Sequence, residues 1–370
     1  MQPGPDFRTL GNQLPGLTPN PTGMGNRLRS TEFSSYGKKV VESSGGVQPR
    51  NIGWSVGNFC PYECKHCYTK AVRAERRELT SLDVERIVGG ISGLGVKGVT
   101  LGGNEPIFAG ARGSELLPFI LQELRDANID VALVTSGFTV TDLRRRDLLD
   151  RGAIAHVAVS LDSPEGDEHD GHRGARLFKN AIHSLRLLQS EGLPHSILYT
   201  AMSWNLEPSH IDSLLEVARD THSYIRINVA KSYDSQITPS ARQLMRAFRI
   251  LLSESVSVVI AEPLLKEFFG LSVQPPACGV RTFRINSPDD LGRISVTPCQ
   301  YRHDLRAGDL RVQDLPDVSS GNSPDASALC SCLVACDIDV PSDLAEVEIS
   351  EDPEVEVFRD YLCTWIGRPW

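Results

Sequence analysis

Residues 60–68 read Cys-Pro-Tyr-Glu-Cys-Lys-His-Cys-Tyr, which places three cysteines at Cys60, Cys64 and Cys67. A short loop with this C-x3-C-x2-C spacing can carry three thiolates to three irons of a [4Fe–4S] cube. Because such a cube normally takes four cysteine thiolates, a three-cysteine loop leaves one iron open to a small molecule. Zinc is the alternative, since cysteines at short spacing also hold zinc.

A second motif lies downstream, where residues 99–106 read Val-Thr-Leu-Gly-Gly-Asn-Glu-Pro. Glycines let the backbone approach a ligand closely, and the Glu105 carboxylate can accept a hydrogen bond from a cationic amine. Together the two motifs resemble the cluster loop and the Gly-Gly-Glu-Pro turn of the radical S-adenosylmethionine (SAM) superfamily. In that family the turn holds the methionine end of SAM. Asn104 stands where a third glycine is common, and asparagine tolerates positive φ better than most residues.

Short apolar runs alternate with amphipathic stretches between about residues 50 and 260. The apolar runs span residues 52–56, 98–101, 130–134, 156–161, 196–200 and 224–229, and the amphipathic stretches span residues 79–94, 115–127, 142–151, 175–191, 208–220 and 239–253. This order predicts an α/β fold with a parallel sheet covered by helices, and right-handed crossovers curl such a sheet toward a barrel. The six units agree with the partial (β/α)6 TIM barrel that the radical SAM resemblance implies for residues 49–265.

Candidate SAM-binding residues fall after the expected strands, where the chemistry of such barrels gathers. Hydroxyl and carboxylate side chains suit the ribose hydroxyls and the aminoacyl group of SAM, although turn and cap chemistry is the alternative at any one position. The resemblance implies SAM contacts from His66, Gly102, Gly103, Asn104, Glu105, Pro106, Thr135, Ser136, Ser160, Asp162 and Arg173.

The segment after the fourth strand gives a further resemblance. Residues 161–164, 169–170 and 173–174 are similar to the corresponding segment of radical SAM enzymes that carry a cysteine-rich SPASM extension. We expect Arg173 to pair with a carboxylate, either that of SAM or that of Asp170, and we favour the structural pair. Residues 165–170 are expected to form a solvated acidic loop, although such a loop would also suit a cationic aminoglycoside. His169 and His172 are expected to lie in a solvated loop rather than to bind a metal with the surrounding acids.

The remaining cysteines all lie after residue 277, at Cys278, Cys299, Cys330, Cys332, Cys336 and Cys363. The first two bracket an expected hairpin. This tail resembles a SPASM or shorter twitch extension, which implies a small α+β domain over residues 266–370 with one auxiliary [4Fe–4S] cluster. Its expected ligands are Cys278, Cys299 and two of the Cys330, Cys332 and Cys336 group, with Cys336 favoured. A spare thiol is inert by default, and the sharper hypothesis makes Cys363 a hydrogen-atom donor.

Composition limits the classes of function. The net charge of −9 argues against a nucleic-acid partner. There is no apolar run of 18 residues and no signal-peptide pattern, so neither a membrane span nor secretion is indicated. Grouped cysteines in such a chain point to metal or catalysis in the cytoplasm rather than to disulfides. Residues 1–48, rich in Pro, Gly, Ser and Asn, are expected to form a flexible or surface-draped arm.

The resemblance implies an enzyme that takes an electron from a donor such as flavodoxin or ferredoxin, cleaves SAM reductively and abstracts hydrogen with the 5′-deoxyadenosyl radical. The SPASM-like segment favours a ribosomal-peptide maturase that crosslinks or epimerises its substrate. The arm lacks the pattern of a leader-binding module, so a separate leader-peptide-binding protein is expected. A sugar or aminocyclitol dehydrogenase or epimerase is the alternative. A non-catalytic iron–sulfur electron carrier or a zinc-stabilised module would leave Glu105, Thr135, Ser160 and Asp162 unexplained.

Overall fold

The computed structural model describes residues 28–29, 51–67, 69–70, 77–93, 96, 98–110, 116–149, 154–230, 236–240, 243–244, 246–247, 250–251, 258–260, 284–297 and 308–309. All six tail cysteines and most of residues 1–50 lie outside these ranges. The auxiliary cluster, its ligands and the role of Cys363 therefore stay predictions.

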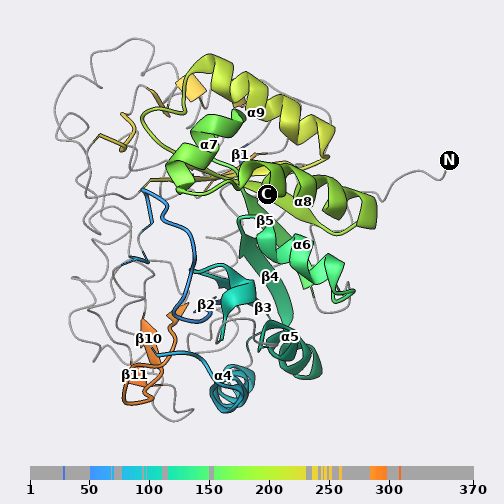
Figure 1. The fold of residues 1–370 in the computed structure, drawn as a ribbon, viewed down its shortest axis with the longest axis vertical. Helices are drawn as coiled ribbons and strands as arrows, with labels where there is room; N and C mark the ends of the chain where they lie inside the picture. The colour runs from blue at the N-terminus through green and yellow to red at the C-terminus, as the bar shows by residue number, and fades with distance from the viewer. Residues whose placement is uncertain are drawn as a thin grey trace.

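A parallel sheet forms the centre of the described chain (Figure 1). Its consecutive strands are β2 (Asn51–Ser55), β3 (Gly98–Gly102), β4 (Asp130–Thr135), β5 (Ile154–Ser160), β6 (His195–Ala201), β7 (Tyr224–Val229) and β8 (Val258–Ile260). Each is parallel to its neighbour. The six expected strands are confirmed, and β8 is a seventh that the sequence did not predict. The parallel α/β fold is that of the expected partial barrel, with the sheet left open.

Helices follow the strands as the alternation predicts, and Figure 1 shows them along one side of the sheet. They are α4 (Ser81–Gly93), α5 (Leu116–Asp126), α6 (Phe138–Arg145), α8 (Phe178–Glu191) and α9 (Pro208–Asp220). The expected bounds 142–151 for α6 are wrong, because Gly137 takes a φ of 101° and starts the helix directly after β4. Within the described ranges, no helix combines the length and the apolar character that crossing a membrane requires.

Residues 165–170 do not form the expected solvated loop. Glu165 is the N-cap, and residues 166–170 belong to helix α7 (Gly166–Arg173), whose first turn is acidic and whose last turn is basic, a distribution that the helix dipole favours. Gly174 ends the helix with a φ of 67°. His169, His172 and Arg173 are buried. The loop prediction failed because this short helix is too polar to show an apolar period.

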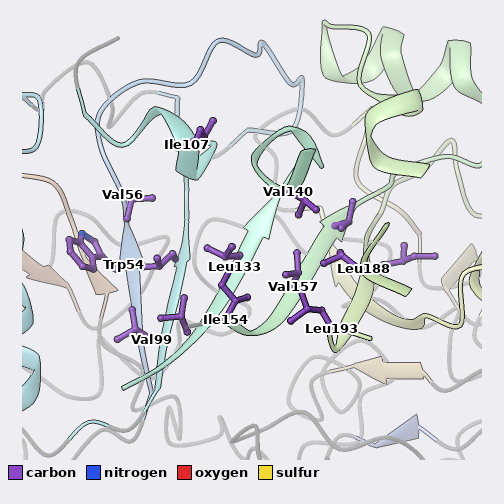
Figure 2. Close-up of a cluster of buried hydrophobic side chains, with 14 of the residues drawn as sticks. Trp54, Val56, Val99, Ile107, Leu133, Val140, Ile154, Val157, Leu188 and Leu193 are labelled. Carbon is purple, nitrogen blue, oxygen red and sulfur yellow. The ribbon is translucent and has the colours of Figure 1, made fainter. Parts of the chain in front are cut away.

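Apolar side chains from strands and helices fill one continuous core (Figure 2). Trp54 of β2, Leu133 of β4 and Val157 of β5 are fully buried. Strand β5 is buried on both faces along most of its length, as expected for a parallel strand covered on both sides. Buried positions on α5 recur at the helical spacing 117, 120, 121 and 124. The core thus fixes the strands whose carboxyl ends carry the candidate site.

The sheet continues beyond β2 into the tail. Strand β9 (Arg284–Ile285) pairs in parallel with β2 and antiparallel with β10 (Ser295–Thr297), which also pairs with β11 (Gly308–Asp309). The expected hairpin between Cys278 and Cys299 is therefore confirmed, and it extends the core sheet. At the opposite edge, β1 (Leu28–Arg29) pairs in parallel with β8.

The buried His156 side chain on β5 gives a prediction about acid stability. Its Nε2 lies 2.8 Å from the Tyr224 hydroxyl, and burial, with smaller effects of Arg226 and His195, lowers the pKa of His156 to about 3. The unfolded chain takes up this proton below about pH 6.5 while the folded chain does not. Stability from this group is present above that pH and is lost as the pH falls toward 3. We expect about 2 kcal/mol to be lost between pH 6.5 and pH 5.

Urea unfolding of wild type and His156→Gln at pH 7 and pH 5 measures this effect. The loss of unfolding free energy on acidification should be smaller in His156→Gln by about 2 kcal/mol. His183→Gln, at an exposed position on α8, serves as the control and should keep the wild-type difference. An identical pH dependence in all three proteins would contradict the assignment.

Candidate functional site

The three cysteines lie on the loop that follows β2. Cys60, Cys64 and Cys67 are partly buried and form no disulfide within the described residues, whereas Glu63 and Lys65 between them are exposed. The loop therefore turns its thiols inward and its charges toward solvent. Among the described residues, no group of three His, Cys, Asp or Glu side chains is placed to hold a single metal ion. A single zinc ion needs such convergence, whereas in a cube each thiolate binds a different iron.

Helix α7 holds one end of the cysteine loop. The backbone N–H of Lys65 donates to the His172 carbonyl oxygen at 3.1 Å. A Cβ on Gly174 would lie 3.1 Å from the Glu63 carbonyl oxygen, and the φ of 67° there also favours glycine. The end of α7 and the loop are thus in direct backbone contact.

The turn after β3 holds the other end of the loop. The Thr69 hydroxyl donates to the Gly103 carbonyl oxygen at 2.6 Å, and the Cys67 Sγ lies 3.3 Å from that hydroxyl. The cysteine loop and the glycine-rich turn are therefore connected through Thr69, a residue that was not predicted as part of the site.

Asn104 fastens the same turn to the end of β2. Its Nδ2 donates to the carbonyl oxygens of Val56 at 3.0 Å and Gly57 at 2.7 Å. The residue in the left-handed region is Gly103, with a φ of 81°, and Asn104 is not in that region. The expectation that Asn104 is tolerated for its positive φ is wrong, because its amide acts as a cross-link between the two strand ends.

Glu105 is buried and binds the start of α6. Its Oε2 accepts from the Ser136 N–H at 2.8 Å and its Oε1 from the Thr139 N–H at 3.0 Å, and the Thr135 and Thr139 hydroxyls also donate to Oε1. The carboxylate thereby satisfies orphan donors at a helix N-terminus. Thr135 and Ser136, predicted as SAM contacts, are brought together here with Glu105. Thr139 was missed because the helix was expected to start later.

Asp162 and Arg173 form a buried ion pair. The Arg173 Nε donates to Asp162 Oδ2 at 2.7 Å, and both side chains are almost inaccessible to solvent. The expected structural pairing of Arg173 is confirmed, but Asp170 is not its partner. Asp170 Oδ1 instead accepts from the N–H groups of Leu177 and Phe178, at 2.8 Å and 2.7 Å, and caps the start of α8.

The Asp162–Arg173 pair sets the charge beside the cysteine loop. Burial alone would raise the pKa of Asp162, but Arg173 and His66 outweigh it and hold that pKa well below its ordinary value. Burial raises the pKa of the Cys64 thiol to about 11, while Arg173 opposes this shift. A cation beside Cys64 favours the thiolate, which is the form that binds metal.

A row of aromatic side chains leads away from this pair. His66 Nδ1 lies 2.8 Å from His172 Nε2, and His66 Nε2 lies 3.9 Å from Asp162 Oδ2. Burial lowers the pKa of His66 to about 4, against the opposing effect of Asp162, so the ring is neutral near pH 7. The His172 ring packs at 5.0 Å from the ring of Trp204, which follows β6. His66 was predicted as a SAM contact, and the structure places it against α7.

Asn205, like Trp204, was missed by sequence reasoning. Its Nδ2 donates to the carbonyl oxygens of Asp162 at 2.8 Å and Thr200 at 2.9 Å, while its Oδ1 accepts from the Met202 N–H at 2.7 Å. A Trp-Asn pair directly after an apolar strand was the only available signal.

The other predicted contacts also lie at strand ends. Gly102 ends β3, Pro106 begins the short 3-10 helix η1 (Pro106–Phe108), and Ser160 ends β5 and is buried. The structure therefore gathers the predicted core residues at the carboxyl ends of β2 to β5. The tail cysteines lie outside the described residues.

The Glu105 contacts predict a stability effect. In Glu105→Gln an amide NH₂ replaces one acceptor oxygen and faces N–H or O–H donors, so a buried donor loses its partner. We expect a loss of about 1–3 kcal/mol in unfolding free energy by urea denaturation. Glu85→Gln, on the exposed side of α4, should change little. Equal stability of Glu105→Gln and wild type would show that the carboxylate does not hold α6.

The buried ion pair predicts a larger effect. Asp162→Asn leaves the Arg173 guanidinium buried without a counter-ion, which should cost about 3–5 kcal/mol in unfolding free energy. Asp167→Asn, exposed in the first turn of α7, should cost about 0.5 kcal/mol. In the double variant Asp162→Asn/Arg173→Met, the loss should be smaller than the sum of the two single losses. Strict additivity would contradict the pairing.

Comparisons with known proteins agree with this geometry. The family model described as the Radical SAM superfamily matches residues 54–215. GTP 3′,8-cyclase of Tolumonas auensis is 27% identical over 165 residues, which are 44% of this chain and 47% of that protein. PqqA peptide cyclase of Streptomyces rochei is 32% identical over 140 residues, which are 37% of this chain and 36% of that protein. The chain thus spans less than half the length of these curated relatives.

Solved structures show the same fold. Streptococcus suis SuiB bound to S-adenosylmethionine aligns with a TM-score of 0.55 at 12% identity, covering 83% of this chain and 72% of SuiB. The anSMEcpe structure with AdoMet and the Cp18Cys peptide aligns with a TM-score of 0.53 at 16% identity, covering 74% of this chain and 81% of that one. The cysteine loop, the Gly-Gly-Asn-Glu-Pro turn and strands β3 to β6 all fall within the residues that the family model matches. Residues 54–215 therefore match the Radical SAM superfamily model, and the solved structures share the fold of this chain.

Proposed function

We propose that this chain is an enzyme that holds a [4Fe–4S] cluster through Cys60, Cys64 and Cys67 and binds SAM beside it. The observation that carries this proposal is the attachment of the cysteine loop to the Gly103 turn through Thr69. It puts a three-thiol loop and a glycine-rich turn in contact at the carboxyl ends of adjacent strands, where barrels of this class carry their chemistry.

The donor set fits such a cluster. Three partly buried thiols lie on one loop, and Arg173 supplies a positive charge beside Cys64. When bound, the cluster supplies the electron that cleaves SAM into methionine and a 5′-deoxyadenosyl radical, which takes hydrogen from the substrate.

In this proposal the residues of the chain bind and orient SAM and shield the reaction from water. The methionine end of SAM can approach the Gly102–Gly103 backbone closely, because glycine has no side chain. Glu105 accepts four hydrogen bonds and thereby keeps the turn after β4 rigid. We assign the remaining contacts to Asn104, Pro106, Thr135, Ser136 and Ser160, as the family resemblance implies. His66, Asp162 and Arg173 support the cluster side of the site.

We further propose a ribosomal-peptide substrate that is crosslinked or epimerised. In support, PqqA peptide cyclase is among the relatives, and one neighbouring structure is SuiB bound to the precursor peptide SuiA, with a TM-score of 0.51 at 14% identity. A flavodoxin or ferredoxin would supply electrons, and a separate protein would bind the leader peptide. An auxiliary cluster on Cys278, Cys299 and the later cysteines, and hydrogen donation by Cys363, belong to the same proposal.

A small-molecule substrate is the second candidate, and the similarity to GTP 3′,8-cyclase favours it. The peptide and small-molecule candidates are distinguished by adding each substrate to the reconstituted enzyme in the presence of SAM and a reductant. A short precursor peptide encoded beside this gene should lose two hydrogens on crosslinking, or gain deuterium from D₂O on epimerisation. Turnover of a sugar or a nucleotide, with none of the peptide, would reject the peptide proposal.

Cluster content tests the cofactor part of the proposal. After anaerobic reconstitution, iron and sulfide per chain are compared between wild type and the Cys60/Cys64/Cys67→Ala variant. About eight irons falling to about four would indicate one cluster on the loop and one elsewhere in the chain. About four falling to zero would confine the proposal to the loop cluster and remove the auxiliary one. An iron content unchanged by the triple substitution would reject the loop cluster.

A further inference from the structure

The hairpin in the tail contacts both ends of the candidate SAM site. Its first strand, β9, pairs with β2 through Gly53 and Trp54, just before the cysteine loop. Arg284 on β9 is buried, although arginine is seldom buried without a specific partner. The side chain reaches from the tail to the carboxyl ends of β2 and β3.

Arg284 bridges the two strand ends. Its Nε donates to the Ser55 Oγ at 2.5 Å, and Ser55 is the register partner of Gly102 on β3. A Cβ on Gly103 would clash with the Arg284 Nη2 and would lie 2.7 Å from the Ser55 Oγ. The guanidinium therefore occupies the space that a side chain at residue 103 would need.

The rest of the hairpin is fixed to the same region. The Ser287 hydroxyl lies 3.1 Å from the Ser55 carbonyl oxygen and 2.7 Å from that of Gly57, which also accepts from Asn104. The N–H of Arg77 donates to the Pro288 carbonyl oxygen at 2.9 Å. The hairpin is thus anchored on the chain segments before and after the cysteine loop.

We propose that Arg284 is a positioning residue that fixes the Gly103 turn in the conformation that binds SAM. The inference rests on the proposed function. A glycine at φ 81° is conformationally free in isolation, so its carbonyl and amide must be fixed by neighbours. Thr69 donates to the Gly103 carbonyl oxygen, and the planar guanidinium of Arg284 fills the space beside the Gly103 Cα. Docking of the tail hairpin and affinity for SAM are thereby linked.

The test compares reconstituted wild type with Arg284→Met. The readouts are iron per chain, the dissociation constant for SAM, and the change that SAM causes in the electron paramagnetic resonance spectrum of the reduced cluster. Arg284→Met should keep its iron, bind SAM roughly 10–100-fold more weakly, as the loss of an outer-shell partner does, and show a reduced spectral change. Arg293→Met, exposed at the turn of the same hairpin and paired with Asp289, should match wild type in all three.

A double variant tests the contact itself. Gly103→Ala should displace the guanidinium, so Gly103→Ala/Arg284→Met should bind SAM no more weakly than Gly103→Ala alone. Additive losses of SAM affinity in the double variant would overturn the positioning role. So would an Arg284→Met variant that binds SAM as tightly as wild type, or one that loses its iron together with its SAM affinity. If wild type holds four irons on the loop but does not bind SAM, the proposed function is rejected, and the inference about Arg284 is rejected with it.

Discussion

The cysteine loop has no regular hydrogen-bonded structure of its own, so its shape depends on the elements that hold it. The described contacts come from three directions: the end of α7 through His172, the Gly103 turn through Thr69, and the end of β2 through Asn104. Each of these residues belongs to a segment that follows a parallel strand: Thr69 follows β2, Asn104 follows β3, and His172 lies on α7 after β5. The parallel register of the sheet is therefore what brings the loop and the turn together, and the apolar core fixes that register.

Buried charge beside the loop adds a second constraint. A buried Arg173 or Asp162 without a counter-ion would strongly destabilise the fold. The pair is stabilised by the 2.7 Å hydrogen bond between the two side chains and by the Thr200 N–H, which donates to Asp162 Oδ1 at 3.4 Å. Pairing with Asp162 therefore allows the charged Arg173 side chain to remain buried near Cys64. That charge opposes the effect of burial on the Cys64 thiol, whose pKa still lies at about 11, and it favours the thiolate form that the proposed cluster requires.

The sequence predicted the strands well because parallel strands buried on both faces read as continuous apolar runs, as in residues 154–160. It failed at α7, where a polar composition conceals a helix that buries His169 and His172. It predicted Glu105 as a SAM contact but could not show the donors around the carboxylate, which lie at and just before the start of the helix that begins at residue 138. Arg284 was beyond sequence reasoning, because its contact with Ser55 joins residues 229 positions apart.

The central claim is that the loop and the turn form one SAM-cleaving site. The most direct measurement is the formation of methionine and 5′-deoxyadenosine from SAM by the reduced, reconstituted protein, compared with Cys64→Ala. We predict that wild type releases the two products in equal amounts and that Cys64→Ala releases neither. A wild-type protein that holds four irons on the loop and binds SAM, yet releases no 5′-deoxyadenosine under reducing conditions, would contradict the account.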